Sequence, residues 1–196
     1  RADELLDALR DNRILEKLPV TPLTLSLISI LFEENNLEIP ATITDIYDNF
    51  NSLLTGRAIV ARSFELIDVS FRERILSLYA LELLKRTNHT PMTRDEFIDF
   101  FVKYYESKTI KIKKGSLYDL LDYLINNTGI LGLKNGKYVH FSHDSFMEYY
   151  GALEIFKHQR EMEHYLWENF FETNWQNSAI FYAGKSKDLP LFLEKV

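Results

Sequence analysis

Apolar residues recur at intervals of three and four along most of the chain, which is the spacing of one face of an α-helix. The stripes predict helices over residues 2–16, 22–34 and 43–55. A longer helix is expected from about residue 64 or 70 to 86, and others begin after residues 93, 116 and 144. Two or three more are expected, around 161–171, 175–184 and 188–196. In the second helix apolar residues occupy both sides, with Ile30 on one and Leu25 on the other. That helix is therefore expected to be buried nearly all round.

Polar residues and glycines indicate where several of these helices begin and end. Thr21-Pro22 is a favourable helix start, with Thr as the cap and Pro at the first helical position. Thr93 to Glu96 has the spacing of a capping box, in which the two side chains satisfy each other's free N–H groups. Ser116 is expected to cap the following helix, and Gly56 to stop the third one.

A short hairpin is the only β-structure that the pattern predicts. Residues 130–133 and 138–141 are strand-like, and the Asn135-Gly136 pair between them favours a primed turn. Three helices followed by a hairpin is the order of elements in a winged-helix domain, a variant of the helix-turn-helix plan. We therefore expect a mainly α fold: a helical bundle over residues 1–60, a winged-helix domain over 61–158, and further helices over 159–196, where a second helical or repeat region begins.

The overall charge and the absence of cysteine exclude several classes of binding site and cross-link. A formal net charge of −6 argues against general affinity for nucleic acid or for an anionic membrane. The chain has no cysteine, which excludes disulfides and thiolate metal sites and suits a cytoplasmic protein. It begins in a helical pattern at Arg1 without an initiator Met, so we expect it to be part of a longer protein.

The strongest candidate for a ligand contact is His143, where the second strand runs into an amphipathic helix. The N-terminal end of a helix offers free N–H groups and a partial positive charge, both of which favour an anion such as phosphate. A histidine at such a joint can equally be a local cap or a hydrogen-bonding partner in the core. The sequence contains no glycine-rich phosphate loop, zinc ligand set or nucleophile elbow. No catalytic or metal-binding residue is therefore assigned, and the chain is not expected to be an enzyme by itself.

Three segments in a fixed order carry a family resemblance. They are residues 18–25 (Leu-Pro-Val-Thr-Pro-Leu-Thr-Leu), 40–48 (Pro-Ala-Thr-Ile-Thr-Asp-Ile-Tyr-Asp) and 141–150 (Phe-Ser-His-Asp-Ser-Phe-Met-Glu-Tyr-Tyr). Together they resemble the region downstream of the nucleotide-binding core in NACHT-type STAND NTPases, signalling ATPases that include NOD-like receptors and bacterial defence proteins. The third segment is the most specific. It departs from the usual pattern at Met147, where Gln is commoner, and at Gly151.

This resemblance implies a role as part of an ATP/ADP switch. By analogy, Pro22 would pack on adenine and His143 would contact the terminal phosphate of bound ADP, with Phe146, Glu148 and Tyr149 packed behind it. The Walker segments and the Mg²⁺ that accompanies ATP would belong to an upstream NACHT domain, the implied partner of this chain. ATP would release the winged helix and allow the parent protein to form a homo-oligomer.

Two other functions remain open from the sequence. A winged-helix module could bind nucleic acid or regulate transcription, but its groove-reading helix, residues 116–126, carries Asp119 and Asp122 where basic or amide side chains are usual. A purely structural helical scaffold would be favoured if His143 were buried and bonded only to protein.

Overall fold

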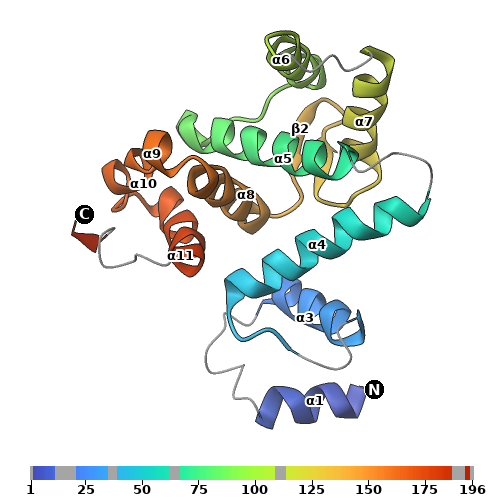
Figure 1. Cartoon of the computed structure of the whole chain (residues 1–196), viewed down its shortest axis with the longest axis vertical. Helices are drawn as coiled ribbons and strands as arrows, with labels where there is room; N and C mark the ends of the chain where they lie inside the picture. The colour runs from blue at the N-terminus through green and yellow to red at the C-terminus, as the bar shows by residue number, and fades with distance from the viewer. Residues whose placement is uncertain are drawn as a thin grey trace.

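The computed structural model describes residues 2–11, 21–34, 39–61, 67–108, 114–186 and 193–194. Within them the fold is mainly α-helical with one short antiparallel hairpin, as the sequence predicted (Figure 1). The helices are α1 (Ala2–Asp11), α3 (Pro22–Glu34), α4 (Ile43–Ala61), α5 (Ile67–Lys85), α6 (Arg94–Glu106), α7 (Lys114–Asn126), α8 (Asp144–Lys157), α9 (Gln159–Met162), α10 (His164–Glu168) and α11 (Gln176–Lys185). The strands are β1 (Leu131–Lys134) and β2 (Tyr138–Phe141), and 3-10 turns lie at Thr87–His89 and Thr173–Trp175.

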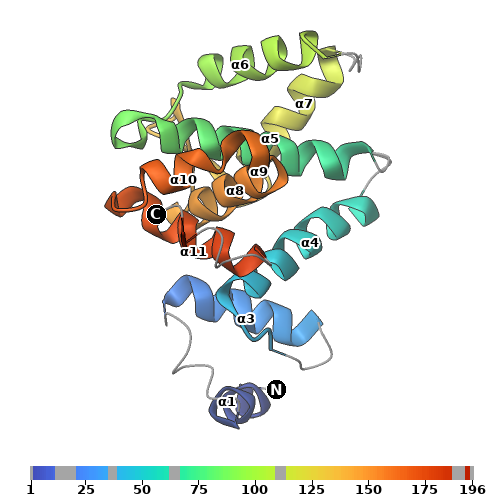
Figure 2. The same ribbon diagram turned by 60° about the vertical axis from the view of Figure 1, so that its left-hand side comes forward.

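Helix α8 is the centre of the molecule. Every residue from Phe146 to Ile155 is buried, and the helix lies between α5 on one side and α11 on the other (Figures 1 and 2). Gly151 permits the close approach to α5, because a Cβ atom there would overlap the Leu84 side chain. A helix buried over most of its circumference must find partners for its polar side chains within the fold, which explains the network described below.

The unit formed by α5, α6, α7 and the hairpin has the element order of a winged helix. Asn135 (φ 55°) and Gly136 (φ 65°) both have positive φ, as the predicted primed turn requires. The capping box is also confirmed, since Thr93 Oγ1 accepts from the Glu96 N–H and Glu96 Oε2 accepts from the Thr93 N–H. The structure adds a bridge between Thr93 and Tyr138 that the sequence did not indicate. The segment before α6 therefore adds a single bridged residue to the hairpin, beside β2.

A buried tyrosine of α5 holds this small sheet in place. Tyr79 donates a hydrogen bond to the Val139 carbonyl (2.6 Å) and accepts one from the Met92 N–H (3.2 Å). Burial raises the pKa of Tyr79, so the phenol stays protonated and can serve both partners. The hairpin is thus bonded to the first helix of its own unit.

Several predicted limits were wrong. Helix α4 continues past Gly56 to Ala61, because one interior glycine costs only about 1 kcal/mol and does not by itself end a helix. Helix α7 begins at Lys114, before Ser116. Leu25 and Ile30 are 37% and 36% exposed, although α3 lies between α4 and α1 (Figure 1). The helix expected near 161–171 is divided into α9 and α10. Most of the range 188–196 lies outside the described residues.

The described helices share one hydrophobic core that reaches from Leu9 to Tyr182. The predicted domain limits fall close to the end of α4 and the end of α8. Because the core continues across both limits, the three-domain division stays a prediction.

Candidate functional site

His143 is the N-cap residue of α8 and is exposed to solvent. Its backbone is extended (φ −146°, ψ 140°), as is usual for an N-cap, and its carbonyl accepts from the Phe146 N–H at 3.0 Å. The imidazole Nδ1 accepts from the Ser145 N–H at 3.2 Å and lies 2.6 Å from Ser145 Oγ. The local-cap interpretation is therefore correct for Nδ1. The ring is exposed rather than buried, so the condition that favoured a purely structural scaffold is not met.

The cap contact decides which ring nitrogen carries the hydrogen. A backbone N–H can only donate, so Nδ1 must present its lone pair to Ser145. In a neutral imidazole the hydrogen is then on Nε2. Within the described residues Nε2 has no hydrogen-bond partner, so His143 presents an N–H donor to the outside at the positive end of a 14-residue helix.

Ser145 connects this histidine to a helix almost a hundred residues earlier. The Tyr47 hydroxyl donates to Ser145 Oγ at 2.6 Å, and Tyr47 is only 2% exposed. Its ring packs against Phe146, Tyr149 and Phe181, at centroid distances of 5.6, 5.4 and 4.9 Å. The second and third segments of the family resemblance are therefore in direct contact. Both residues lie inside those segments, but the sequence assigned neither of them to the site.

The three residues that the resemblance places behind His143 are buried. Phe146, Glu148 and Tyr149 are 5%, 9% and 2% exposed. Burial raises the pKa of Glu148, although Asn177 donates a hydrogen bond to its carboxylate at 2.9 Å. Asp144 adds an exposed carboxylate in the first turn. With two acids in the first turns of α8 and one N–H donor at its cap, this helix end can supply one contact to an anion but is not a complete anion site.

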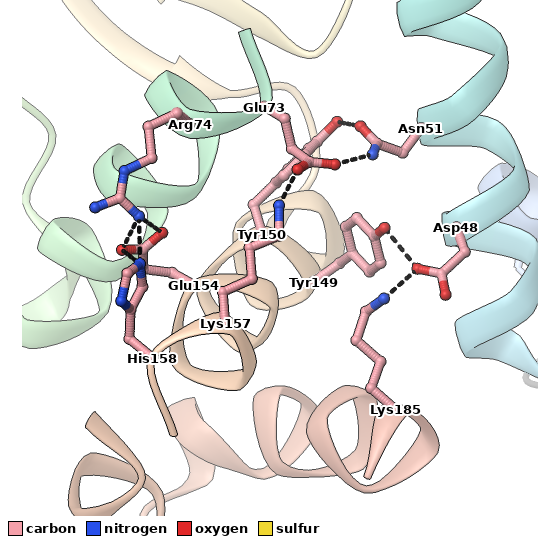
Figure 3. A network of polar contacts seen from close by, with 10 residues as sticks. All are labelled: Asp48, Asn51, Glu73, Arg74, Tyr149, Tyr150, Glu154, Lys157, His158 and Lys185. Atoms are coloured by element: carbon pink, nitrogen blue, oxygen red, sulfur yellow. Dashed lines mark hydrogen bonds and ion pairs between the residues drawn. The ribbon is translucent and has the colours of Figure 1, made fainter. Parts of the chain in front are cut away.

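A polar network on the far side of Tyr149 joins α4 to the C-terminal helices (Figure 3). Asp48 Oδ1 accepts from the Tyr149 hydroxyl at 2.7 Å and from Lys185 Nζ at 2.6 Å. Burial, followed by the charge of Asp48, raises the pKa of Tyr149, so this hydroxyl remains a donor. Helix α11 also approaches α4 so closely that a Cβ on Gly184 would overlap the Thr44 side chain.

A second, separate set of polar contacts joins α4 to α8 and α5. Tyr150 donates to Asn51 Oδ1 at 2.8 Å, and Asn51 Nδ2 donates to Glu73 at 2.7 Å. Lys157 pairs with the same carboxylate. Helix α4 is thus docked on α8 by aromatic packing and by two separate sets of polar contacts (Figure 3).

The second predicted ligand contact, Pro22, is the first residue of α3 and is exposed. Thr21 caps this helix as predicted, since its Oγ1 accepts from the Thr24 N–H at 3.1 Å. Helix α4 lies between α3 and α8 (Figures 1 and 2), so Pro22 and His143 belong to separate elements that α4 connects. The adenine and phosphate contacts themselves stay predictions.

The helix that a nucleic-acid-binding module would use is α7. Its exposed side chains include Tyr118, Asp119 and Tyr123, and Asp122 pairs with Arg94 at 2.7 Å. Acidic and aromatic residues on this face do not match the phosphate backbone of DNA, so no observation favours that function.

The described residues show neither a metal-binding cluster nor a membrane-spanning helix. They contain no group of three or more His, Asp or Glu residues arranged to hold a metal ion. No helix among them combines the length and apolar character needed to cross a bilayer.

Comparison with protein-family models, curated proteins and solved structures found no match for this chain.

Proposed function

We propose that this chain is the regulatory helical and winged-helix part of a cytoplasmic NACHT-type signalling ATPase. In the resting state His143 would bond the terminal phosphate of ADP held by an upstream nucleotide-binding domain. ATP would break that contact, release the winged helix and permit homo-oligomerisation, in the service of defence or stress signalling. The nucleotide and its Mg²⁺ belong to the upstream domain, so the chain alone neither binds ATP tightly nor hydrolyses it.

One observation carries the proposal: His143 is solvent-exposed, and its cap contact leaves Nε2–H as an outward donor. The cap contact supplies the Nε2–H tautomer, and the exposure of His143 leaves that N–H open to a phosphate of another domain. The direct contact between Tyr47 and Ser145 also supports it, because it joins two of the three segments on which the resemblance rests.

The first experiment separates capping from phosphate binding in the full-length parent protein. His143→Asn keeps a good N-cap acceptor for the Ser145 N–H but removes the ring atoms that reach outward. One hydrogen bond to a charged phosphate is worth about 1.5–3 kcal/mol. We therefore expect His143→Asn to release ADP about tenfold or more faster and to raise basal signalling, while the melting temperature changes little.

Two variants serve as controls. His143→Gln places an amide N–H near the position of Nε2 and should retain more ADP than His143→Asn. His140→Gln changes the neighbouring strand histidine, which bonds the Phe141 carbonyl, and should have no effect. Unchanged ADP retention and basal output in His143→Asn would refute the proposed role.

The nucleic-acid alternative has its own test. If this 196-residue chain slowed the migration of duplex DNA in a gel, and did so less as salt rises, nucleic-acid binding would be preferred over the nucleotide switch. Contacts to phosphate weaken with rising salt.

A further inference from the structure

We propose that Tyr47 and Ser145 are positioning residues that make the direction of the His143 donor depend on the docking of α4. This inference rests on the proposed function, because it concerns the regulation of the same histidine. It begins from the chain of contacts Tyr47–Ser145–His143, which crosses from α4 to the first turn of α8.

The order of donors along this chain is determined by chemistry. The Tyr47 hydroxyl donates to Ser145 Oγ, and burial raises the pKa of this tyrosine, so it keeps its hydrogen. The hydrogen of the Ser145 hydroxyl is then free to point at His143 Nδ1, 2.6 Å away. Two donors, the Ser145 hydroxyl and the Ser145 N–H, converge on Nδ1 and exclude the Nδ1–H tautomer. Successive hydrogen bonds of this kind strengthen one another.

The position of Tyr47 depends on how α4 sits on its neighbours. Its ring is enclosed by Phe146 and Tyr149 of α8 and Phe181 of α11. If α4 moved away by about 1 Å, the 2.6 Å contact with Ser145 would lengthen to about 3.6 Å, which is no longer a hydrogen bond. Release of α4 therefore removes one of the hydrogen bonds that favour the Nε2–H tautomer of His143. The docking of α4 on α8 and the phosphate contact of His143 are coupled in this way.

The tautomer of His143 can be measured directly in the 196-residue chain. Long-range ¹H–¹⁵N correlation spectra of histidine-labelled protein distinguish Nδ1–H from Nε2–H, and the His143→Asn spectrum identifies the His143 signals among the five histidines. We expect the Nε2–H form in the unaltered chain. Tyr47→Phe keeps the ring packing and removes the hydroxyl. It should raise the ratio of Nδ1–H to Nε2–H about fivefold, the change that corresponds to one hydrogen bond of about 1 kcal/mol.

A matched control distinguishes this relay from general loosening of the interface. Tyr149→Phe removes a hydroxyl bonded to Asp48 across the same interface but does not touch Ser145. It should leave the His143 tautomer unchanged. Ser145→Ala should shift the ratio at least as far as Tyr47→Phe, and Ser145→Thr, which restores a hydroxyl, should bring it back. If Tyr47→Phe fails to fold, the Ser145 pair decides alone.

Three results would overturn the inference: an Nδ1–H ring in the unaltered chain, no shift in Tyr47→Phe or Ser145→Ala, or an equal shift in Tyr149→Phe. None of these measurements involves nucleotide, so they are independent of the proposed function. If the tautomer responds as expected and His143→Asn still leaves ADP retention in the parent unchanged, the relay stands and the proposed function fails.

Discussion

The ion pair between Asp48 and Lys185 should contribute more to the free energy of unfolding than an equally short ion pair on the surface. The pair joins α4 to α11 at 2.6 Å; the Asp48 side chain is 39% exposed, but that of Lys185 is only 13% exposed. The ammonium also lies 5.6 Å from the Tyr149 ring centroid. Asp48→Asn preserves the shape of the side chain but leaves a mostly buried ammonium without its anion. Hydrogen bonds to charged groups are worth about 1.5–3 kcal/mol, so we expect a loss of about 2–3 kcal/mol in the free energy of unfolding.

A second ion pair in the same protein provides the comparison. Arg94 and Asp122 are separated by 2.7 Å, but their side chains are 43% and 44% exposed. Solvent screens such a pair, so Asp122→Asn should cost less than about 1 kcal/mol. Both variants would be measured by urea denaturation at pH 7, with the slope of the transition checked for a change in two-state behaviour.

A double-mutant cycle isolates the interaction itself. Lys185→Met removes the charge and keeps an apolar side chain of similar length, so Asp48→Asn should become nearly neutral in that background. Equal losses for Asp48→Asn and Asp122→Asn, or an undiminished loss for Asp48→Asn when residue 185 is Met, would refute the argument from burial.

Two further variants test the packing of α8. Gly151→Ala should destabilise the chain by about 1–2 kcal/mol, because the new methyl overlaps Leu84 and the cost of overpacking exceeds the gain in helix propensity. In a Leu84→Ala background the same change should be stabilising. If Gly151→Ala still destabilised the chain in that background, the overlap would not be its cause. Glu148→Gln should stabilise the chain at pH 7. Burial raises the pKa of Glu148 above its ordinary 4.5 in the folded state. The contribution of the protonated Glu148 side chain to stability is therefore complete below pH 4.5, and it is lost as the pH rises through the pKa of the folded state. The advantage of Glu148→Gln should therefore shrink as the pH of the denaturation experiment is lowered towards 4.5, and an advantage independent of pH would contradict this reasoning.

Features that depend on a few neighbouring residues could be predicted from the sequence. The capping box at Thr93 is closed by two side chains three residues apart, and the turn at Asn135-Gly136 needs only positive φ at two adjacent positions. The order of three helices and a hairpin follows from hydrophobic periodicity, which is also a local property.

Errors arose where the local signal was weak or where distant packing decided the outcome. Gly56 was expected to end a helix, but one interior glycine costs only about 1 kcal/mol, and α4 continues beyond it. Ile30 lies on an apolar face of the predicted helix, yet its side chain is 36% exposed, because the neighbours of α3 do not cover all of its sides. Periodicity shows which residues could be buried, but it does not show how many sides of a helix find a neighbour.

The candidate site divides in the same way. The sequence by itself placed His143 between a strand and a helix, because strand alternation ends and helical periodicity begins at that residue. Only the tertiary structure decided that the ring is exposed and that Ser145 links Nδ1 to Tyr47, 98 residues from Ser145. It also brought Lys185 to Asp48, 137 residues apart. Hydrophobic patterning acts over one or two helical turns, whereas the partner of a buried hydroxyl or ammonium is set by how whole helices pack, and that information is spread over the entire chain.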